Sequence, residues 1–140
     1  MQSVSPGTIF RGSNSWINAL PHIAKLTKRP LILGKSFQTN ELRKNILRSL
    51  RVQNINPDSA NLQFDCCYED IARVKNLICR NNNDCVIAAG GGKVLDAGKY
   101  IADSLNIHCI TVPLSASTCA GWTALSNIYT TKGQFIKDVS

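Results

Sequence analysis

The stretch CVIAAGGGKVLDAGKYIA, residues 85–102, determines the fold because a short apolar run passes through three glycines directly into a helical pattern. Residues 85–89 are typical of a buried strand, and residues 93–105 are typical of the helix that follows it. The first turn of a helix presents unpaired N–H groups and the positive end of the helix dipole. Gly90, Gly91 and Gly92 would let a diphosphate approach that backbone closely. The segment therefore predicts an anion-binding turn. The alternative is a tight connection whose glycines serve packing only.

Apolar runs and helical patterns alternate on both sides of this turn. The predicted strands cover residues 5–12, 31–34, 61–66 and 108–113, and the predicted helices cover about 16–27, 41–51 and 70–80. Residues 125–129 and 133–138 are predicted to pair as a hairpin. Continuous apolar strands between helices indicate a parallel sheet with helices on both faces. We expect one α/β domain over residues 1–140, a Rossmann-like, doubly wound, mostly parallel sheet with a C-terminal β-hairpin.

The composition is that of a globular protein, with 44% hydrophobic and 18% charged residues. No apolar run is long enough for a membrane span, and the N-terminus has no pattern of a secretory signal, so we expect a cytoplasmic protein without a membrane partner. The formal charge of +7 fits an anionic partner, either a phosphate-bearing cofactor or nucleic acid. The basic residues are dispersed, however, and we expect no nucleic-acid binding.

One loose basic group lies within the predicted helix 41–51. Its members are Arg43, Lys44, Arg48 and Arg51. The opposite side of that helix would carry Leu42, Ile46, Leu47 and Leu50. Three of the four basic residues can share the polar side of the helix, and we therefore interpret the group as a solvated helix face.

The six cysteines form no CxxC pair and have no spacing suited to zinc. Cys79, Cys85 and Cys109 lie beside apolar residues in segments predicted to be core. Buried free thiols in a reducing compartment are the expected state.

A second unusual segment, VPLSASTCAGWTALSNIY (112–129), follows the strand after the glycine turn. Ligands of doubly wound sheets bind beyond the carboxyl ends of the strands, so both segments are expected at one edge of the molecule. Ser115, Ser117, Thr118 and Thr123 offer hydroxyl groups there. The alternative is a polar surface loop that ends in a core tryptophan.

These motifs together resemble a known family. GGGKxxDxxK, followed about twenty residues later by VPxxASTxAxxxALSxIY, is similar to the glycerol dehydrogenase branch of the iron-containing, metal-dependent alcohol dehydrogenases. SPGTIFRGSNSWINALPHIAKL resembles the opening segment of the same family. The resemblance covers essentially the whole chain but only the family's first domain. It implies an oxidoreductase domain that binds NAD or NADP and that is inactive without a helical domain supplying zinc or iron.

The resemblance also implies roles for individual residues. The diphosphate and adjoining ribose would contact Gly90, Gly91, Gly92, Lys93 and Asp96, and the nicotinamide side would contact Ser117, Thr123, Leu125 and Tyr129. The family's metal ligands, an aspartate and two histidines, would lie beyond residue 140. His22 and His108 are not their counterparts, so we expect neither a metal site nor a catalytic residue in this chain.

The sequence departs from the family pattern at three places. Cys119 stands where glycerol dehydrogenases usually carry an aspartate that contacts the polyol, which argues against glycerol as the substrate. Leu114 replaces a frequent threonine beside the cofactor. Gly34 and Lys35 stand where an acidic residue would hold the adenosine ribose, so Lys35 is a candidate contact for a 2′-phosphate and favours NADP.

Other functions remain open at this level. A sn-glycerol-1-phosphate dehydrogenase or dehydroquinate synthase would share the glycine turn, and a non-catalytic nucleotide-binding module would explain Lys35, Leu114 and Cys119. A small alcohol or polyol is the expected substrate of the full enzyme. Without the helical domain, Trp122 and Ile128 are expected to be exposed, which would favour self-association or disorder of the 114–125 loop. A homo-oligomer is a further expectation.

Overall fold

The computed structural model describes residues 7–114 and 126–139. Its helices are α1 (Ser15–Leu26), the 3-10 turn η1 (Phe37–Thr39), α2 (Asn40–Val52), α3 (Tyr68–Asn81) and α4 (Gly92–Leu105). Its strands are β1 (Pro30–Gly34), β2 (Asp58–Asn61), β3 (Cys85–Gly90), β4 (His108–Pro113), β5 (Ser126–Tyr129) and β6 (Phe135–Val139). From α1 onward, the element order is that of the predicted α/β fold.

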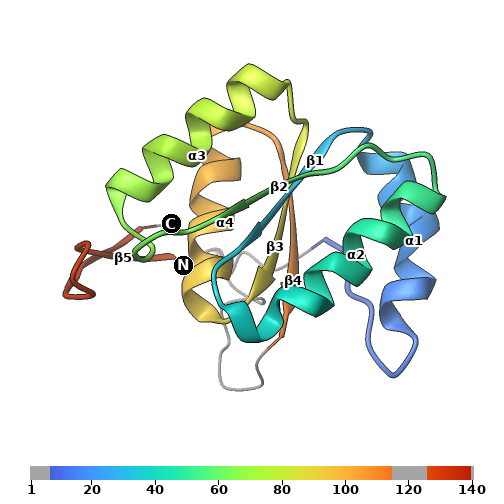
Figure 1. The fold of residues 1–140 in the computed structure, drawn as a ribbon, viewed down its shortest axis with the longest axis horizontal. Coiled ribbons are helices and arrows are strands. Elements are labelled where there is room, and N and C mark those ends of the chain that lie inside the picture. The colour runs from blue at the N-terminus through green and yellow to red at the C-terminus, as the bar shows by residue number, and fades with distance from the viewer. Residues whose placement is uncertain (1–6, 115–125, 140) are drawn as a thin grey trace.

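Strands β1 to β4 form a parallel sheet in the order β2-β1-β3-β4. Figure 1 shows α3 and α4 on one face of this sheet and α1 and α2 on the other. Every residue of β1 and β3 is buried, because each of these two strands has a strand on both sides and a helical layer on both faces. The predicted doubly wound architecture is confirmed.

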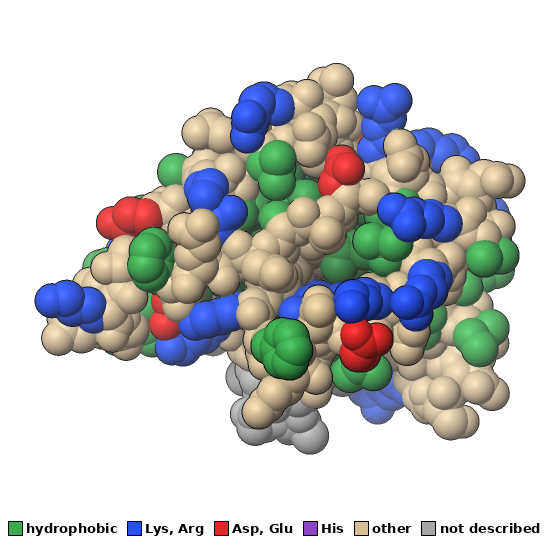
Figure 2. Space-filling model, viewed as in Figure 1, with side chains coloured by type: hydrophobic (Ala, Val, Ile, Leu, Met, Phe, Trp, Pro, Cys, Tyr) green, Lys and Arg blue, Asp and Glu red, His purple; other side chains and the backbone are tan. Residues whose placement is uncertain are grey.

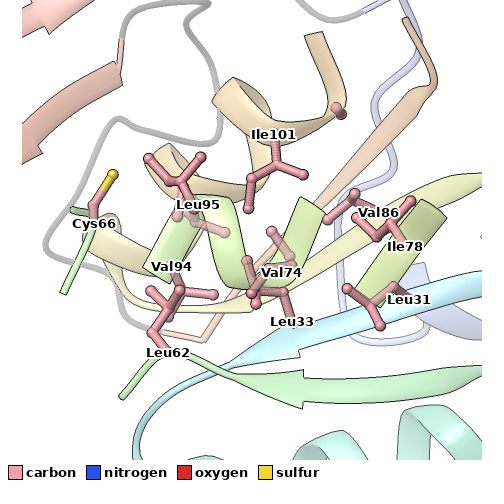
Figure 3. Packing of buried hydrophobic residues seen from close by; sticks show 14 of the residues in the cluster. Leu31, Leu33, Leu62, Cys66, Val74, Ile78, Val86, Val94, Leu95 and Ile101 are labelled. Carbon is pink, nitrogen blue, oxygen red and sulfur yellow. The ribbon is translucent and has the colours of Figure 1, made fainter. Parts of the chain in front are cut away.

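Alternate side chains of the central strands, β1 and β3, belong to two separate hydrophobic clusters. Leu31, Leu33 and Val86 point towards α3 and α4, as Figure 3 shows, where they pack against residues of both helices. Ile32 and Ile87 point the other way and pack against α1 and α2. This alternation is the period of two that an extended strand imposes on a sheet covered on both faces.

Asparagines end both helices on the α3–α4 face. Asn82 and Asn106 follow α3 and α4 with φ angles of 55° and 54°, in the left-handed region. The N–H group of Asn82 donates to Ile78 O, and that of Asn106 donates to Ala102 O, so each closes the last turn. Asparagine enters this conformation more readily than most residues, which fixes the points where the chain turns back into β3 and β4.

Two predicted strands are wrong in detail. Residues 7–12, the described part of the predicted strand 5–12, form no strand. The strand predicted at 61–66 lies at Asp58–Asn61 instead, and residues 62–67 form a loop. The carboxylate of Asp70 accepts hydrogen bonds from the N–H groups of Gln63, Phe64 and Asp65. These bonds wrap the loop around the start of α3, an outcome that local alternation does not indicate.

The C-terminal strands β5 and β6 form the predicted antiparallel hairpin. Its first strand is anchored to the main body, since the N–H of Tyr129 donates to Cys66 O at 2.8 Å. Ile128 is fully buried in the cluster of α3 and α4, so the prediction that Ile128 is exposed is wrong. Trp122, the other residue predicted to be exposed, lies outside the described residues.

The five described cysteines follow the predicted pattern with one exception. Cys66, Cys67 and Cys85 are buried free thiols, and Cys109 is half-buried. Cys79 is exposed, because it lies on the outer side of α3, one residue after the buried Ile78. Within residues 7–114 and 126–139, no helix has the length and apolar character needed to cross a membrane.

Candidate functional site at the glycine turn

The glycine turn joins the last residue of β3 to the first residue of α4. Gly91 is the N-cap of α4 in an extended conformation, and none of the three glycines has a positive φ. These glycines therefore matter because they lack a Cβ, and not because they adopt an unusual backbone angle. A Cβ added at Gly91 would meet nothing within 4 Å, whereas one at Gly90 would lie 3.0 Å from Cβ of Val94. Gly91 thus leaves open space directly in front of the helix N-terminus.

The end of β4 holds this turn in place. The N–H of Leu114 donates to Gly90 O at 3.0 Å, and the N–H of Leu95 donates to Gly91 O at 3.1 Å. The N–H groups of Gly92, Lys93 and Val94 belong to the first turn of α4 and have no acceptor within the helix. The dipole of α4 adds partial positive charge at the same place. This arrangement can accept an anion on backbone donors.

A pocket of about 420 Å³ opens at this turn. It lies between the ends of β1 and β3, which are neighbours in the parallel sheet. Its described walls are Lys35, Ser36, Thr39, Gly90, Gly91, Lys93 and Val94. The pocket therefore brings together three of the predicted cofactor residues, Gly90, Gly91 and Lys93, with a fourth, Lys35, from a separate strand end.

Lys93 reaches the pocket from the first turn of α4 and is held by two contacts. Its Nζ lies 2.6 Å from Oδ2 of Asp65 and 4.8 Å from the centre of the Tyr129 ring. Asp65 is almost fully buried, while the side chain of Lys93 is half exposed. Tyr129, predicted to line the nicotinamide side, is thus drawn to the same end of α4.

Asp96 lies deeper than a residue in contact with the cofactor is expected to lie. Its carboxylate forms an ion pair of 3.2 Å with Lys99, and both side chains are mostly buried. Among the described residues, Asp96 is not on the wall of the pocket. Burial, followed by the charges of Asp96 and Asp65, raises the pKa of the nearby Cys66 thiol to about 12. Cys66 is therefore a neutral thiol rather than a nucleophile.

Lys35 lines the other side of the pocket, and Arg43 lies behind that side, bonded to two of the lining residues, Ser36 and Thr39. The Nζ of Lys35 donates a hydrogen bond to the carbonyl oxygen of Phe64. Arg43 is buried, which corrects its assignment to a solvated helix face. Its guanidinium donates to Ser36 O at 2.7 Å, to Ala89 O at 3.3 Å and to the hydroxyl of Thr39. Burial lowers the pKa of Arg43 below its ordinary value, although arginine stays protonated in proteins.

The sequence contains a signal for the burial of Arg43. Position 43 precedes Ile46 by three residues and Leu50 by seven, which places it on the buried side of α2. The space for its side chain comes from Gly34 in β1. A Cβ at Gly34 would lie 2.1 Å from Nε of Arg43, so the guanidinium occupies the place of a side chain at position 34.

The remaining predicted site residues are Ser117, Cys119, Thr123 and Leu125, together with the hydroxyls of Ser115 and Thr118. They lie outside the described residues. Within the part that the structure describes, no group of three or more His, Cys, Asp or Glu side chains could hold a metal ion.

The sequence profile of the iron-containing alcohol dehydrogenases matches residues 6–139. The chain is 32% identical to a glycerol dehydrogenase of Thermotoga maritima over 135 residues, covering 95% of this chain and 36% of that protein. It is 30% identical to a glycerol dehydrogenase of Escherichia coli over 132 residues, covering 94% of this chain and 36% of that protein. The chain thus spans about a third of the length of these relatives.

Solved structures support the same relationship. The crystal structure of glycerol dehydrogenase from Schizosaccharomyces pombe superimposes with a TM-score of 0.85 and 26% identity, covering 99% of this chain and 35% of that chain. A probable glycerol dehydrogenase from Sinorhizobium meliloti superimposes with a TM-score of 0.84 at 22% identity, covering 99% of this chain and 37% of that chain, which shows a shared fold.

Proposed function

This chain belongs to the iron-containing alcohol dehydrogenase family, and on that premise we propose that it is the domain that binds the nicotinamide dinucleotide of an alcohol or polyol dehydrogenase. One observation supports the proposal above all others. Gly91 leaves open space in front of the N-terminus of α4, within a pocket that is also lined by Lys35 and Lys93. A helix N-terminus with this access suits a diphosphate.

The residues present fit such a cofactor. The diphosphate would lie against Gly90, Gly91 and the first N–H groups of α4, and the pocket would extend from there towards Lys35, Ser36 and Thr39, where we place the adenosine half. Lys93 would face the diphosphate from the wall of the pocket, its ammonium held in position by Asp65. Ser117, Thr123, Leu125 and Tyr129 remain the proposed contacts on the nicotinamide side.

The bound nicotinamide would accept a hydride from the alcohol. This chain's own residues would bind and orient the dinucleotide, because hydrogen bonds hold the glycine turn and an ion pair holds Lys93. The metal of the family would have to be held by residues other than those described here, since they offer no such group. Asp96 would act from below the turn, where its ion pair with Lys99 fixes the second turn of α4.

The substrate is proposed as a small alcohol or polyol, because several relatives are named glycerol dehydrogenases. Cys119 stands at the position expected to contact the polyol, and a thiol is a weak hydrogen-bond partner for a hydroxyl. We therefore propose a substrate less hydroxylated than glycerol. For the cofactor we propose NADP over NAD, because the end of β1 carries Lys35 and no acidic residue.

Titration of the purified protein with NADH and NADPH, followed by nicotinamide fluorescence, tests this proposal. A Gly91→Asp variant places a carboxylate in the space proposed for the diphosphate and should weaken binding of both dinucleotides by at least about tenfold. Asn76→Asp adds the same charge to the exposed side of α3 and is the matched control. Unchanged binding in Gly91→Asp, or no saturable binding by the unaltered protein, would refute the proposal.

A further inference from the structure

We propose that a small hollow beside the cofactor pocket is a phosphate-monoester subsite, built around Arg43, that selects a dinucleotide carrying a 2′-phosphate. The inference rests on the proposed function, since it concerns the adenosine side of the same cofactor. It differs from the assignment of Lys35 alone, because it places the selecting charge on α2, with neutral hydrogen-bond donors from β2.

The hollow has a volume of about 70 Å³ and lies between α2 and the strands β1 and β2. Its floor is apolar, formed by Ile32 and Leu47, whereas the rest of its lining can donate hydrogen bonds. These donors are Asn40, Arg43, Lys44, Ser59 and Asn61. Arg43 and Lys44 carry a positive charge, and Lys44 is paired with Glu41 at 3.0 Å, so Arg43 is the charge without a carboxylate partner among the described residues. Figure 2 shows basic side chains gathered over α2 on this face of the molecule.

Arg43 lines the hollow and is bonded to residues that line the larger pocket. Its guanidinium bonds to Ala89 O at the end of β3 and to Ser36 O beyond the end of β1, so it spans the gap between the two strands. Ser36 and Thr39, which accept from Arg43, line the larger pocket. A ribose in that pocket would therefore lie next to the guanidinium.

The charge of Arg43 is buried without a carboxylate to balance it. The acceptors of its hydrogen bonds are two carbonyl groups and a hydroxyl, and its Nε donates to no described residue. None of the ion pairs in the described part of the chain involves Arg43. A buried cation is costly unless an anion compensates it, and a phosphate group supplies both the charge and the acceptor atoms.

Gly34 makes the arrangement possible. Any side chain at position 34 would overlap the guanidinium, so a residue there would push Arg43 away from the strand ends. In dinucleotide-binding folds, an acidic residue that binds the ribose hydroxyls excludes a 2′-phosphate. Here no acidic residue occurs between Pro30 and Asn40, and Arg43 occupies the vacated space. Asn61, paired in register with Gly34, brings a side-chain amide to the same strand end.

Calorimetric titration with NADPH and NADH, before and after substitution, tests the subsite. Asn61→Asp puts a negative charge at the rim of the hollow, on an exposed residue, and should weaken NADPH binding about tenfold or more while leaving NADH binding within about twofold. Arg48→Glu, a larger charge change on the exposed side of α2 outside the hollow, is the control and should preserve the ratio of the two affinities. Arg43→Gln should remove the preference for NADPH.

Three further measurements separate the ligand chemistry from the fold. Adenosine 2′,5′-bisphosphate should bind more tightly than adenosine 5′-monophosphate, and inorganic phosphate should compete with NADPH more strongly than with NADH. The preference for NADPH should also grow as the pH rises through about 6, where a phosphate monoester takes its second charge. Equal affinities for NADPH and NADH that Asn61→Asp does not change would overturn the subsite and leave the proposed function intact. Failure of both dinucleotides to bind would overturn both.

Discussion

Lys93 and Asp65 form an ion pair of 2.6 Å that joins the first turn of α4 to the loop between β2 and α3. The pair is asymmetric, because Asp65 is 4% exposed and Lys93 is 46% exposed. Loss of the lysine therefore leaves a buried carboxylate, whereas loss of the aspartate leaves a cation in contact with water.

We predict that Lys93→Met lowers the free energy of unfolding by about 1–3 kcal/mol, since an unpaired buried carboxylate is penalised. The double variant Lys93→Met/Asp65→Asn should recover most of that loss, because the amide carries no charge and can still accept from the N–H of Cys66. Urea unfolding at neutral pH measures both values. A double variant less stable than Lys93→Met would contradict the assignment.

Gly98 sets how closely α4 approaches the sheet. A Cβ at this position would lie 2.5 Å from Cβ of Ala88 in β3, closer than two carbon atoms can pack. The gain in helix propensity from alanine is about 1 kcal/mol, but the overlap forces the helix away from the strand. We expect Gly98→Ala to lower the free energy of unfolding by about 1–3 kcal/mol. Thermal denaturation should show a clear drop in Tm.

The matched control is Gly91→Ala, because a Cβ at Gly91 meets nothing within 4 Å. Its effect on the free energy of unfolding should be about 1 kcal/mol, the typical cost of alanine at an N-cap, and smaller than that of Gly98→Ala. If the two alanine variants had equal stability, close packing at Gly98 would not be the reason for the glycine.

Asp84 holds the chain where it enters β1. Burial alone would raise the pKa of Asp84, but hydrogen bonds from the hydroxyl of Thr27 and the N–H groups of Lys28 and Arg29 outweigh it and lower the pKa. A carboxyl with a lowered pKa stabilises the fold above its unfolded value near 4, and this contribution is lost as the pH falls through the folded value.

We therefore expect Asp84→Asn to be less stable than the unaltered protein at pH 7 and to lose less of its remaining stability between about pH 4 and pH 2. Urea unfolding at a series of pH values gives the slope for both proteins. Asp58→Asn is the control, because Asp58 accepts one side-chain hydrogen bond, from Asn83. An identical acid slope in Asp84→Asn and the unaltered protein would refute the role of Asp84.

Thiol reactivity should separate the cysteines by burial. Cys79 is exposed, whereas burial raises the pKa of the Cys109 thiol to about 12 and leaves it protonated at pH 8. In a Cys119→Ser background, we expect a thiol reagent at pH 8 to modify one cysteine rapidly and the other four only on unfolding. A further Cys79→Ser substitution should abolish the rapid phase. A persistent rapid phase would mean that a buried cysteine is reached through local opening.

The glycine turn and its flanking elements were predictable from sequence because three local signals agree there. The apolar run of β3, the glycines and the helical period of α4 occupy adjacent residues, and no distant contact overrides them. The loop after β2 was not predictable in the same way, since the hydrogen bonds that shape it come from Asp70 in the next helix.

Arg43 shows a second limit of sequence reasoning. Its helical position was visible, but the room for a guanidinium inside the protein is created by Gly34, in a different element. Its positive charge led to the prediction that Arg43 is exposed to solvent. The packing of α2 on β1 shows that it is buried. The roles of Ser117, Cys119, Thr123 and Leu125 stay predictions.

The order β2-β1-β3-β4 has a consequence for how the chain folds. The central pair joins Pro30 to Cys85, so α2, β2 and α3 must all lie in the loop that closes when β1 meets β3. Closing such a long loop costs conformational entropy before the contacts between the two strands can stabilise it. Folding is therefore slow compared with that of a helical bundle. Until this loop closes, the apolar strands β1 and β3 are unpaired and their side chains are exposed to water. Packing of α3 and α4 onto β3 would cover one face of these strands. The other face would stay exposed to water until α1 and α2 pack on it.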